Sequence, residues 1–207
     1  ILRNGIAVDF AMNSVCAAGT GSFLDQQAAR LGIPIEEFGT LALKATNPVR
    51  IAGRCTVFAE SDMIHKQQMG HNIADIIAGL CEALVRNYLN NVGKGKEILP
   101  PIAFQGGVAA NAGIRAAFED ALGHEIIIPE HFSVMGSIGA AMLAQEQMKH
   151  GGKTKFRGFE LADFEYEASS FECKGCANLC EIIQIRRDGK IIARWGGRCS
   201  KWDAAAV

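Results

Sequence analysis

The amino-acid sequence predicts an α/β fold for residues 1–150, followed by a small cysteine-rich appendage. Short apolar segments alternate there with longer amphipathic segments, and Gly-rich turns separate the two kinds. Four of the seven cysteines fall together near the end of the chain. We therefore predict an α/β domain over 1–150, a polar connector over 151–170 and a metal-binding appendage over 171–207.

Turn signals and apolar periodicity predict the elements of the first part. Asn4-Gly5 lies between apolar residues and predicts a β-hairpin with a return strand over 6–10. From Ile73 to Tyr88, apolar residues recur every three or four positions, as on one face of a long helix. The remaining expected elements are helices over 22–31, 56–68, 112–122 and 136–149, and strands over 102–105 and 125–128.

Composition narrows the function classes. The formal net charge of -1 gives no electrostatic case for nucleic acid or for an anionic membrane surface. No apolar run approaches the roughly 20 residues of a membrane span, and no secretory signal is visible. An odd cysteine count without such a signal favours metal or redox chemistry over disulfides. The chain starts without Met and is interpreted as a fragment of a longer protein.

Two Gly-rich turns could bring backbone close to a ligand. Gly19-Thr20-Gly21 precedes a predicted helix, and Gly106-Gly107 separates a predicted strand from another helix. Helix N-termini offer unpaired N–H groups that suit phosphate, and glycine lets that backbone approach closely. Neither turn matches the Walker A or dinucleotide fingerprint, so spacing alone also fits ordinary tight turns.

Cysteines occur beside two predicted helix starts. Cys16 and Cys55 each come just before such a start, where the helix dipole stabilises a thiolate. On spacing alone, their wide separation favours unliganded small residues in turns. Cys81, by contrast, lies on the apolar face of the helix over 73–88 and is interpreted as a buried structural thiol.

The appendage contains a C-x2-C-x3-C…C set. An Asp188-Gly189 turn predicts a hairpin of strands 181–185 and 191–195, which would fold the fourth cysteine back onto the first three. Four clustered soft ligands indicate one tetrahedral site for zinc or an iron–sulfur cluster. The predicted ligands are Cys173, Cys176, Cys180 and Cys199.

Three ordered motifs stand out: NSVCAAGTGSFLD (13–25), GRCTVFAESD (53–62) and FQGGVAAN (104–111), the last followed by GSIGAA (136–141). Together they resemble the BadF/BadG/BcrA/BcrD-type ATPases, which include the 2-hydroxyacyl-CoA dehydratase activators and the ATPase components of benzoyl-CoA reductases. This resemblance implies an actin/Hsp70/sugar-kinase-like (ribonuclease H-like) ATPase subdomain that binds ATP or ADP with Mg²⁺. It places Gly19, Thr20 and Gly21 near the phosphates, and Gly106, Gly107 and Asn111 in the adenosine-binding turn.

The resemblance also implies a redox role. Cys16 and Cys55 would ligate a [4Fe–4S] cluster shared between the two subunits of a homodimer. ATP-driven motion would then send low-potential electrons to a dehydratase or reductase partner in the cytoplasm. The family's upstream phosphate loop is absent from this chain, so ATPase activity is expected of the intact protein, and this chain holds about half of the nucleotide cleft. The appendage resembles part of the long, fused family members.

Two other functions fit parts of the sequence. A sugar or metabolite kinase of the same fold would need an upstream carboxylate and would not need Cys16 or Cys55. A zinc-stabilised interaction module would need only the appendage. Glu60 and Asp62 point to different faces of a helix and are not expected to act as a pair.

Overall fold

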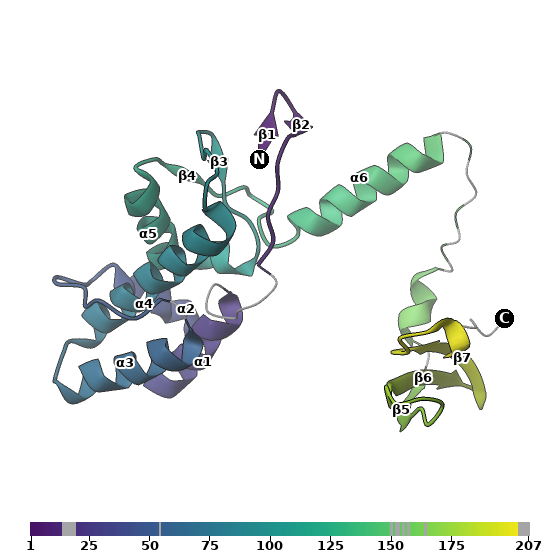
Figure 1. The fold of residues 1–207 in the computed structure, drawn as a ribbon. Helices are drawn as coiled ribbons and strands as arrows, with labels where there is room; N and C mark the ends of the chain where they lie inside the picture. Colours follow the sequence, from purple (N-terminus) through teal and green to yellow (C-terminus); the bar gives the residue numbers. More distant parts are fainter. Residues whose placement is uncertain are drawn as a thin grey trace. The chain divides into compact units, whose positions relative to one another are not determined.

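The computed structural model places most of the chain in two compact units. They comprise Ile1–Glu146 and Gln147–Val207 and are described separately. Figure 1 shows the chain coloured from its N-terminus to its C-terminus. The described residues are 1–13, 20–53, 55–149, 151, 154, 156, 158–163 and 165–202.

Helices form the body of the first unit. They are α1 (Gly21–Leu31), α2 (Ile35–Ala42), α3 (Thr56–Gln68), α4 (Ile73–Tyr88) and α5 (Ala112–Leu122), while α6 (Met135–Lys149) spans the boundary to the second unit. All except α2 were predicted from the sequence. Within the described part of the chain, every helix is too short or too polar to cross a membrane.

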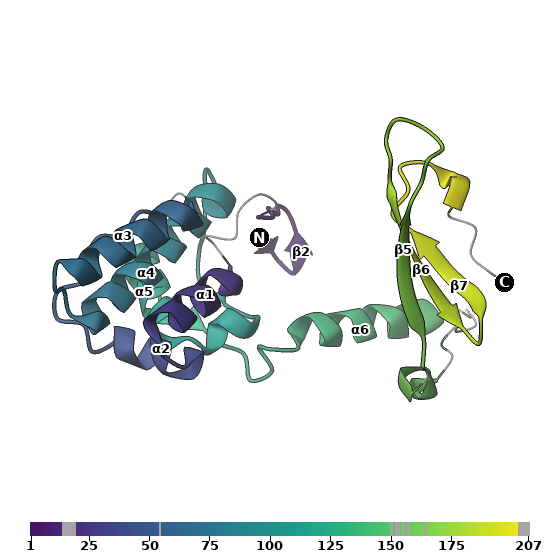
Figure 2. The same ribbon diagram turned by 90° about the horizontal axis from the view of Figure 1, so that it is seen from below.

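Helix α4 is the centre of the first unit. Its N-cap Asn72 accepts a hydrogen bond from the Ala74 N–H through its side-chain oxygen, at 2.9 Å. The predicted apolar face is fully buried at Ile76, Ile77 and Leu80. Helices α2, α3 and α5 all pack against α4, which explains why most residues of α4 are buried, including the polar Asp75 and Asn87 (Figure 2).

The strands of the first unit are short. The predicted hairpin is confirmed: β1 (Leu2–Arg3) pairs antiparallel with β2 (Ile6–Ala7). Strands β3 (Ile102–Ala103) and β4 (Ile126–Ile127) pair in parallel, and α5 lies between them in sequence. Each strand is shorter than predicted, because a strand extends only where a neighbour continues the ladder. The mixture of helices and parallel strands agrees with the α/β class.

The second unit contains an antiparallel sheet in the order β5-β6-β7. The strands are β5 (Glu167–Glu172), β6 (Glu181–Arg187) and β7 (Lys190–Trp195). The predicted turn at Asp188-Gly189 joins β6 to β7, and both turn residues have positive φ. Strand β5 was not predicted and begins inside the segment assigned to a connector.

Candidate functional site

The two predicted nucleotide-binding turns lie side by side. Thr20 is the extended N-cap residue of α1, and the helix begins at Gly21. A Cβ atom on Gly21 would lie 3.0 Å from Cγ2 of Val108, a residue of the second turn. The fold therefore brings together segments that are far apart in the sequence. Gly19 lies outside the described residues.

The second turn exposes its backbone. Gly106 has a φ of 98°, which favours glycine, and its N–H donates to the Phe132 carbonyl at 2.8 Å. Gly107 begins a 3-10 turn, Gly107–Ala110. A Cβ on either glycine would meet no atom of the described residues within 4 Å, so the described part of the chain leaves this backbone accessible to a ligand.

Asn111 has a structural role that the motif alone does not reveal. It is the N-cap of α5, and its Oδ1 accepts a hydrogen bond from the Ile114 N–H at 3.0 Å. A substitution there would release a helix cap as well as change the predicted adenosine turn. Binding and stability therefore have to be measured separately at this position.

Cys55 is the N-cap residue of α3. Its backbone is extended, and its carbonyl accepts a hydrogen bond from the Ala59 N–H at 2.9 Å. The residue is half-buried. No acidic residue lies in the first turn of α3 to offset the positive end of the helix dipole. This position suits a thiolate or an anionic metal cluster. Cys16, its predicted partner, lies outside the described residues.

Apolar surface lies beside Cys55. Val57 and Phe58, in the first turn of α3, are 66% and 67% exposed. Two large apolar side chains next to a candidate ligand form a small uncovered patch, as expected where another protein surface packs.

Cys81 is unsuited to ligation. It is 1% exposed in the core on α4, and burial raises the pKa of its thiol to about 12. A thiol that stays protonated is a poor nucleophile and a poor metal ligand. The structure thus supports the predicted structural role of Cys81.

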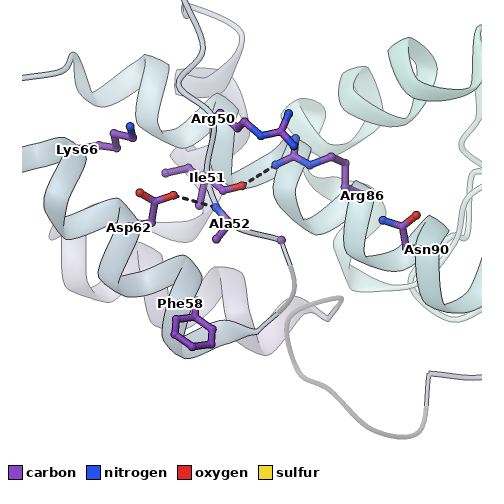
Figure 3. A pocket seen from close by; sticks show the side chains of 9 residues that line it. Arg50, Ile51, Ala52, Phe58, Asp62, Lys66, Arg86 and Asn90 are labelled. Atoms are coloured by element: carbon purple, nitrogen blue, oxygen red, sulfur yellow. Dashed lines mark hydrogen bonds between the residues drawn. The ribbon is translucent and has the colours of Figure 1, made fainter.

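Polar side chains surround the backbone of residues 50–53. They line a cavity of about 610 Å³ between α3 and α4 (Figure 3). Asp62 points to this backbone, whereas Glu60 pairs with Arg30 at 2.7 Å, so the two carboxylates serve different partners as predicted. Glu60 and Asp62 belong to the segment 53–62 quoted above, whereas no local motif marks Arg86 and Asn90. The polar or charged lining residues are Arg50, Asp62, Lys66, Arg86 and Asn90.

The appendage cysteines flank the loop between β5 and β6 and the end of β7. The Cys173 N–H donates to the Cys180 carbonyl at 2.8 Å, and the Leu179 N–H donates to the Cys176 carbonyl at 3.3 Å. Among the described residues, no three potential ligands of the His, Cys, Asp or Glu type gather closely enough to hold a metal ion. The predicted four-sulfur site, which includes Cys199, therefore stays a prediction.

Cys173 nevertheless has a thiolate-stabilising environment. The Trp202 indole N–H donates to its Sγ at 3.2 Å, and this bond lowers the pKa of the thiol. A backbone hydrogen bond from Gly175 and the charge of Lys201 act in the same direction. Deprotonated sulfur is the form that binds metals, so this donor set is compatible with a metal ligand at Cys173.

Comparison with known proteins gives a consistent family match for the first unit. The profile of the BadF/BadG/BcrA/BcrD ATPase family matches residues 1–144. The 2-hydroxyisocaproyl-CoA dehydratase activator of Clostridioides difficile is 35% identical over 151 residues, covering 73% of this chain and 56% of the activator. The (R)-2-hydroxyglutaryl-CoA dehydratase activating ATPase of Acidaminococcus fermentans is 38% identical over 149 residues, covering 70% and 56%. The chain thus spans about half the length of the curated relatives it matches.

Solved structures agree with these matches. The activator of the 2-hydroxyisocaproyl-CoA dehydratase from Clostridium difficile with bound ADPNP superposes with a TM-score of 0.65 at 34% identity, covering 74% of this chain and 58% of that one. Component A of the (R)-2-hydroxyglutaryl-CoA dehydratase of Acidaminococcus fermentans gives a TM-score of 0.67 at 36% identity, covering 72% and 57%.

Proposed function

Because the chain belongs to the BadF/BadG/BcrA/BcrD ATPase family, we propose that it works in an ATP-dependent activator that supplies low-potential electrons from a [4Fe–4S] cluster. The electron acceptor would be a 2-hydroxyacyl-CoA dehydratase or a benzoyl-CoA reductase-like enzyme. The position of Cys55 carries this proposal, because it presents a half-buried thiol at a helix N-terminus beside exposed apolar residues.

ATP or ADP with Mg²⁺ is the proposed nucleotide. Gly21 lies against Val108, so the two Gly-rich turns are close together. The backbone at Gly106 and Gly107 is accessible, which suits close approach of a ligand. The relative solved with ADPNP supports the same ligand class. Since the chain spans about half of its relatives, hydrolysis is proposed for the intact protein.

A [4Fe–4S] cluster fits Cys55 on chemical grounds. When bound, such a cluster supplies one-electron redox chemistry at low potential. This chain would provide two thiolates, Cys55 and Cys16, and a two-fold homodimer would provide four. The exposed side chains of Val57 and Phe58, beside Cys55, support a dimer interface at this position. A sugar kinase of the same fold would have no use for this cysteine, so iron content separates the two functions.

We expect anaerobically purified full-length protein to contain iron and a broad visible absorption band, both lost in Cys55→Ser. Cys81→Ser is the matched control and should keep both, because the Cys81 thiol is buried and protonated. Iron content and absorption are measured on the same samples, with ATP binding by calorimetry beside them. If Cys55→Ser keeps all of its iron, Cys55 is not a ligand of the cluster. If the wild-type protein contains no iron, the proposed redox function is wrong.

We propose separately that Cys173, Cys176, Cys180 and Cys199 bind one metal centre, either a zinc ion or an iron–sulfur cluster. The lowered pKa of Cys173 and the short loop between Cys173 and Cys180 support this proposal. A small β-ribbon favours structural zinc, whereas a redox neighbourhood favours iron–sulfur. Zinc analysis of the same samples, with Cys176→Ser as the variant, decides between them.

A further inference from the structure

The backbone of residues 51–53, which ends two positions before Cys55, is held by side chains from two helices. The Arg86 Nη2 group donates to the Ile51 carbonyl at 2.6 Å, and the Asn87 Nδ2 group donates to the Gly53 carbonyl at 2.6 Å. From the other side, Asp62 Oδ2 accepts the Ala52 N–H at 3.0 Å. Two of these bonds are visible in Figure 3, where Arg86 and Asp62 approach the same backbone segment from opposite directions.

These three side chains form hydrogen bonds with backbone groups that a helix or strand would otherwise pair with other backbone groups. Residues 51–53 belong to no helix or strand, so their conformation depends on such contacts. The segment also lies directly against α4, because a Cβ on Gly53 would come within 2.8 Å of the Ala83 carbonyl oxygen. A larger residue at position 53 would push the segment away from the helix.

Two of the three side chains are themselves oriented by neighbours. The Asn91 Nδ2 group donates to Asn87 Oδ1 at 3.1 Å, which turns the Asn87 amide nitrogen towards Gly53. Glu82 lies 3.5 Å from Arg86 Nη1, one turn back on α4. Asn91 belongs to the π-helical turn Leu89–Gly93 that continues α4. Such π turns depart from regular helix geometry and often occur at functional sites.

We propose that Asp62, Arg86 and Asn87 are positioning residues that fix the Cys55 thiol by clamping residues 51–53 to α3 and α4. This inference rests on the proposed function, in which Cys55 is a cluster ligand. A rigid clamp would carry any displacement of α4 to the backbone that bears the thiol.

The clamp is tested in the full-length protein with Arg86→Met and Asn87→Asp. Met keeps most of the Arg86 side-chain length without a donor, and Asp keeps the shape of Asn87 without the amide N–H₂. Asn72→Ala is the matched control, because it removes a hydrogen bond at the N-terminus of α4 and touches no residue of the 51–53 segment.

The first measurement uses cluster-free protein and follows alkylation of Cys55 by iodoacetamide with peptide mass spectrometry. We expect alkylation to be about fivefold faster in Arg86→Met and in Asn87→Asp, because each variant loses about one ordinary hydrogen bond. Asn72→Ala should react at the wild-type rate. Asp62→Ala should behave like the clamp variants, whereas Asp62→Asn retains an acceptor oxygen and should restore the wild-type rate. Because Asp62 lies on α3, the two substitutions at this position test the clamp even where a variant of α4 fails to fold.

The second measurement is the electron paramagnetic resonance spectrum and midpoint potential of the cluster in anaerobic protein. Changed values in the clamp variants, with wild-type values in Asn72→Ala and Asp62→Asn, would support the positioning role. Wild-type alkylation rates in Arg86→Met, Asn87→Asp and Asp62→Ala, or equal acceleration in Asn72→Ala, would overturn it. Iron-free wild type would reject the proposed function alone, because the alkylation rates are measured without a cluster.

Discussion

At the scale of single residues, Gln27 on α1 is an unusual feature of the core. It is 0% exposed, and neither polar atom of its amide has a hydrogen-bond partner among the residues that the structure describes. Burying an unpaired amide costs about 1–3 kcal/mol, whereas an apolar side chain of similar shape carries no such cost. Gln27 therefore lowers the stability of the first unit.

We expect Gln27→Met to raise the free energy of unfolding by about 1 kcal/mol, because Met fills similar space without unpaired polar atoms. Urea unfolding followed by circular dichroism measures the change. The control is Gln26→Met on the same helix, which loses a hydrogen bond to Glu60 at an exposed site and should give no gain. A loss of stability in Gln27→Met would show that the Gln27 amide is paired in solution, for example with buried water.

The candidate site could be predicted from sequence only where its residues carry a local signal. Gly106-Gly107 stands between a strand and a helix, and Cys55 stands at a helix start, so each was recognisable by type. The clamp residues Arg86 and Asn87 gave no such signal. They bond to backbone carbonyls 35 and 34 residues away, and that pairing depends on how α4 packs.

At the scale of elements, α2 shows how packing overrides local propensity. The sequence around it contains Pro34 at the start and Gly39 in the middle, and glycine disfavours a helix interior by about 1 kcal/mol. The structure supplies the reason for the glycine: a Cβ there would lie 2.6 Å from Asn111 Oδ1 and 2.7 Å from the Ala112 backbone nitrogen. Gly39 allows α2 to approach the start of α5 closely.

Gly39→Ala should therefore destabilise the protein by about 1–3 kcal/mol, because overpacking outweighs the gain in helix propensity. Gly139→Ala is the matched control in α6, where a Cβ meets nothing within 4 Å, and it should stabilise by about 0.5–1 kcal/mol. Thermal unfolding of both variants gives the comparison. Equal stabilisation by the two substitutions would show that α2 and α5 are farther apart than described.

Helix α4 was predictable from its apolar period and its cap, whereas the lengths of the strands were not predictable from the sequence. α4 combines a capping Asn72 with an unbroken apolar face, and α1 ends at Gly32 in the left-handed conformation. Strand lengths depend on which neighbours continue the ladder, and β3 extends over only two residues, both paired with β4. Strand β5 gave no alternating apolar signal, because five of its six residues are exposed.

At the scale of the whole molecule, the two units differ in how much core supports them. The first unit has a large cluster of buried apolar residues centred on α4. In the described part of the second unit, the buried side chains are Cys173, Ile182 and Gln184. So small a core rarely stabilises a domain by itself, and natural domains of this size often use a metal or disulfides. The cysteine set thus matters for stability as well as for chemistry.

Metal removal should consequently act on the second unit alone. If the four cysteines hold zinc, a zinc chelator removes binding free energy that contributes directly to folding. We expect hydrogen exchange in full-length protein to become much faster along β6 and to stay unchanged along α4, because the described residues that form the core around α4 all belong to the first unit. Cys176→Ser should reproduce the chelator effect without chelator. Unchanged exchange along β6 would mean that the appendage folds without metal, and faster exchange along both elements would mean that the two units unfold together.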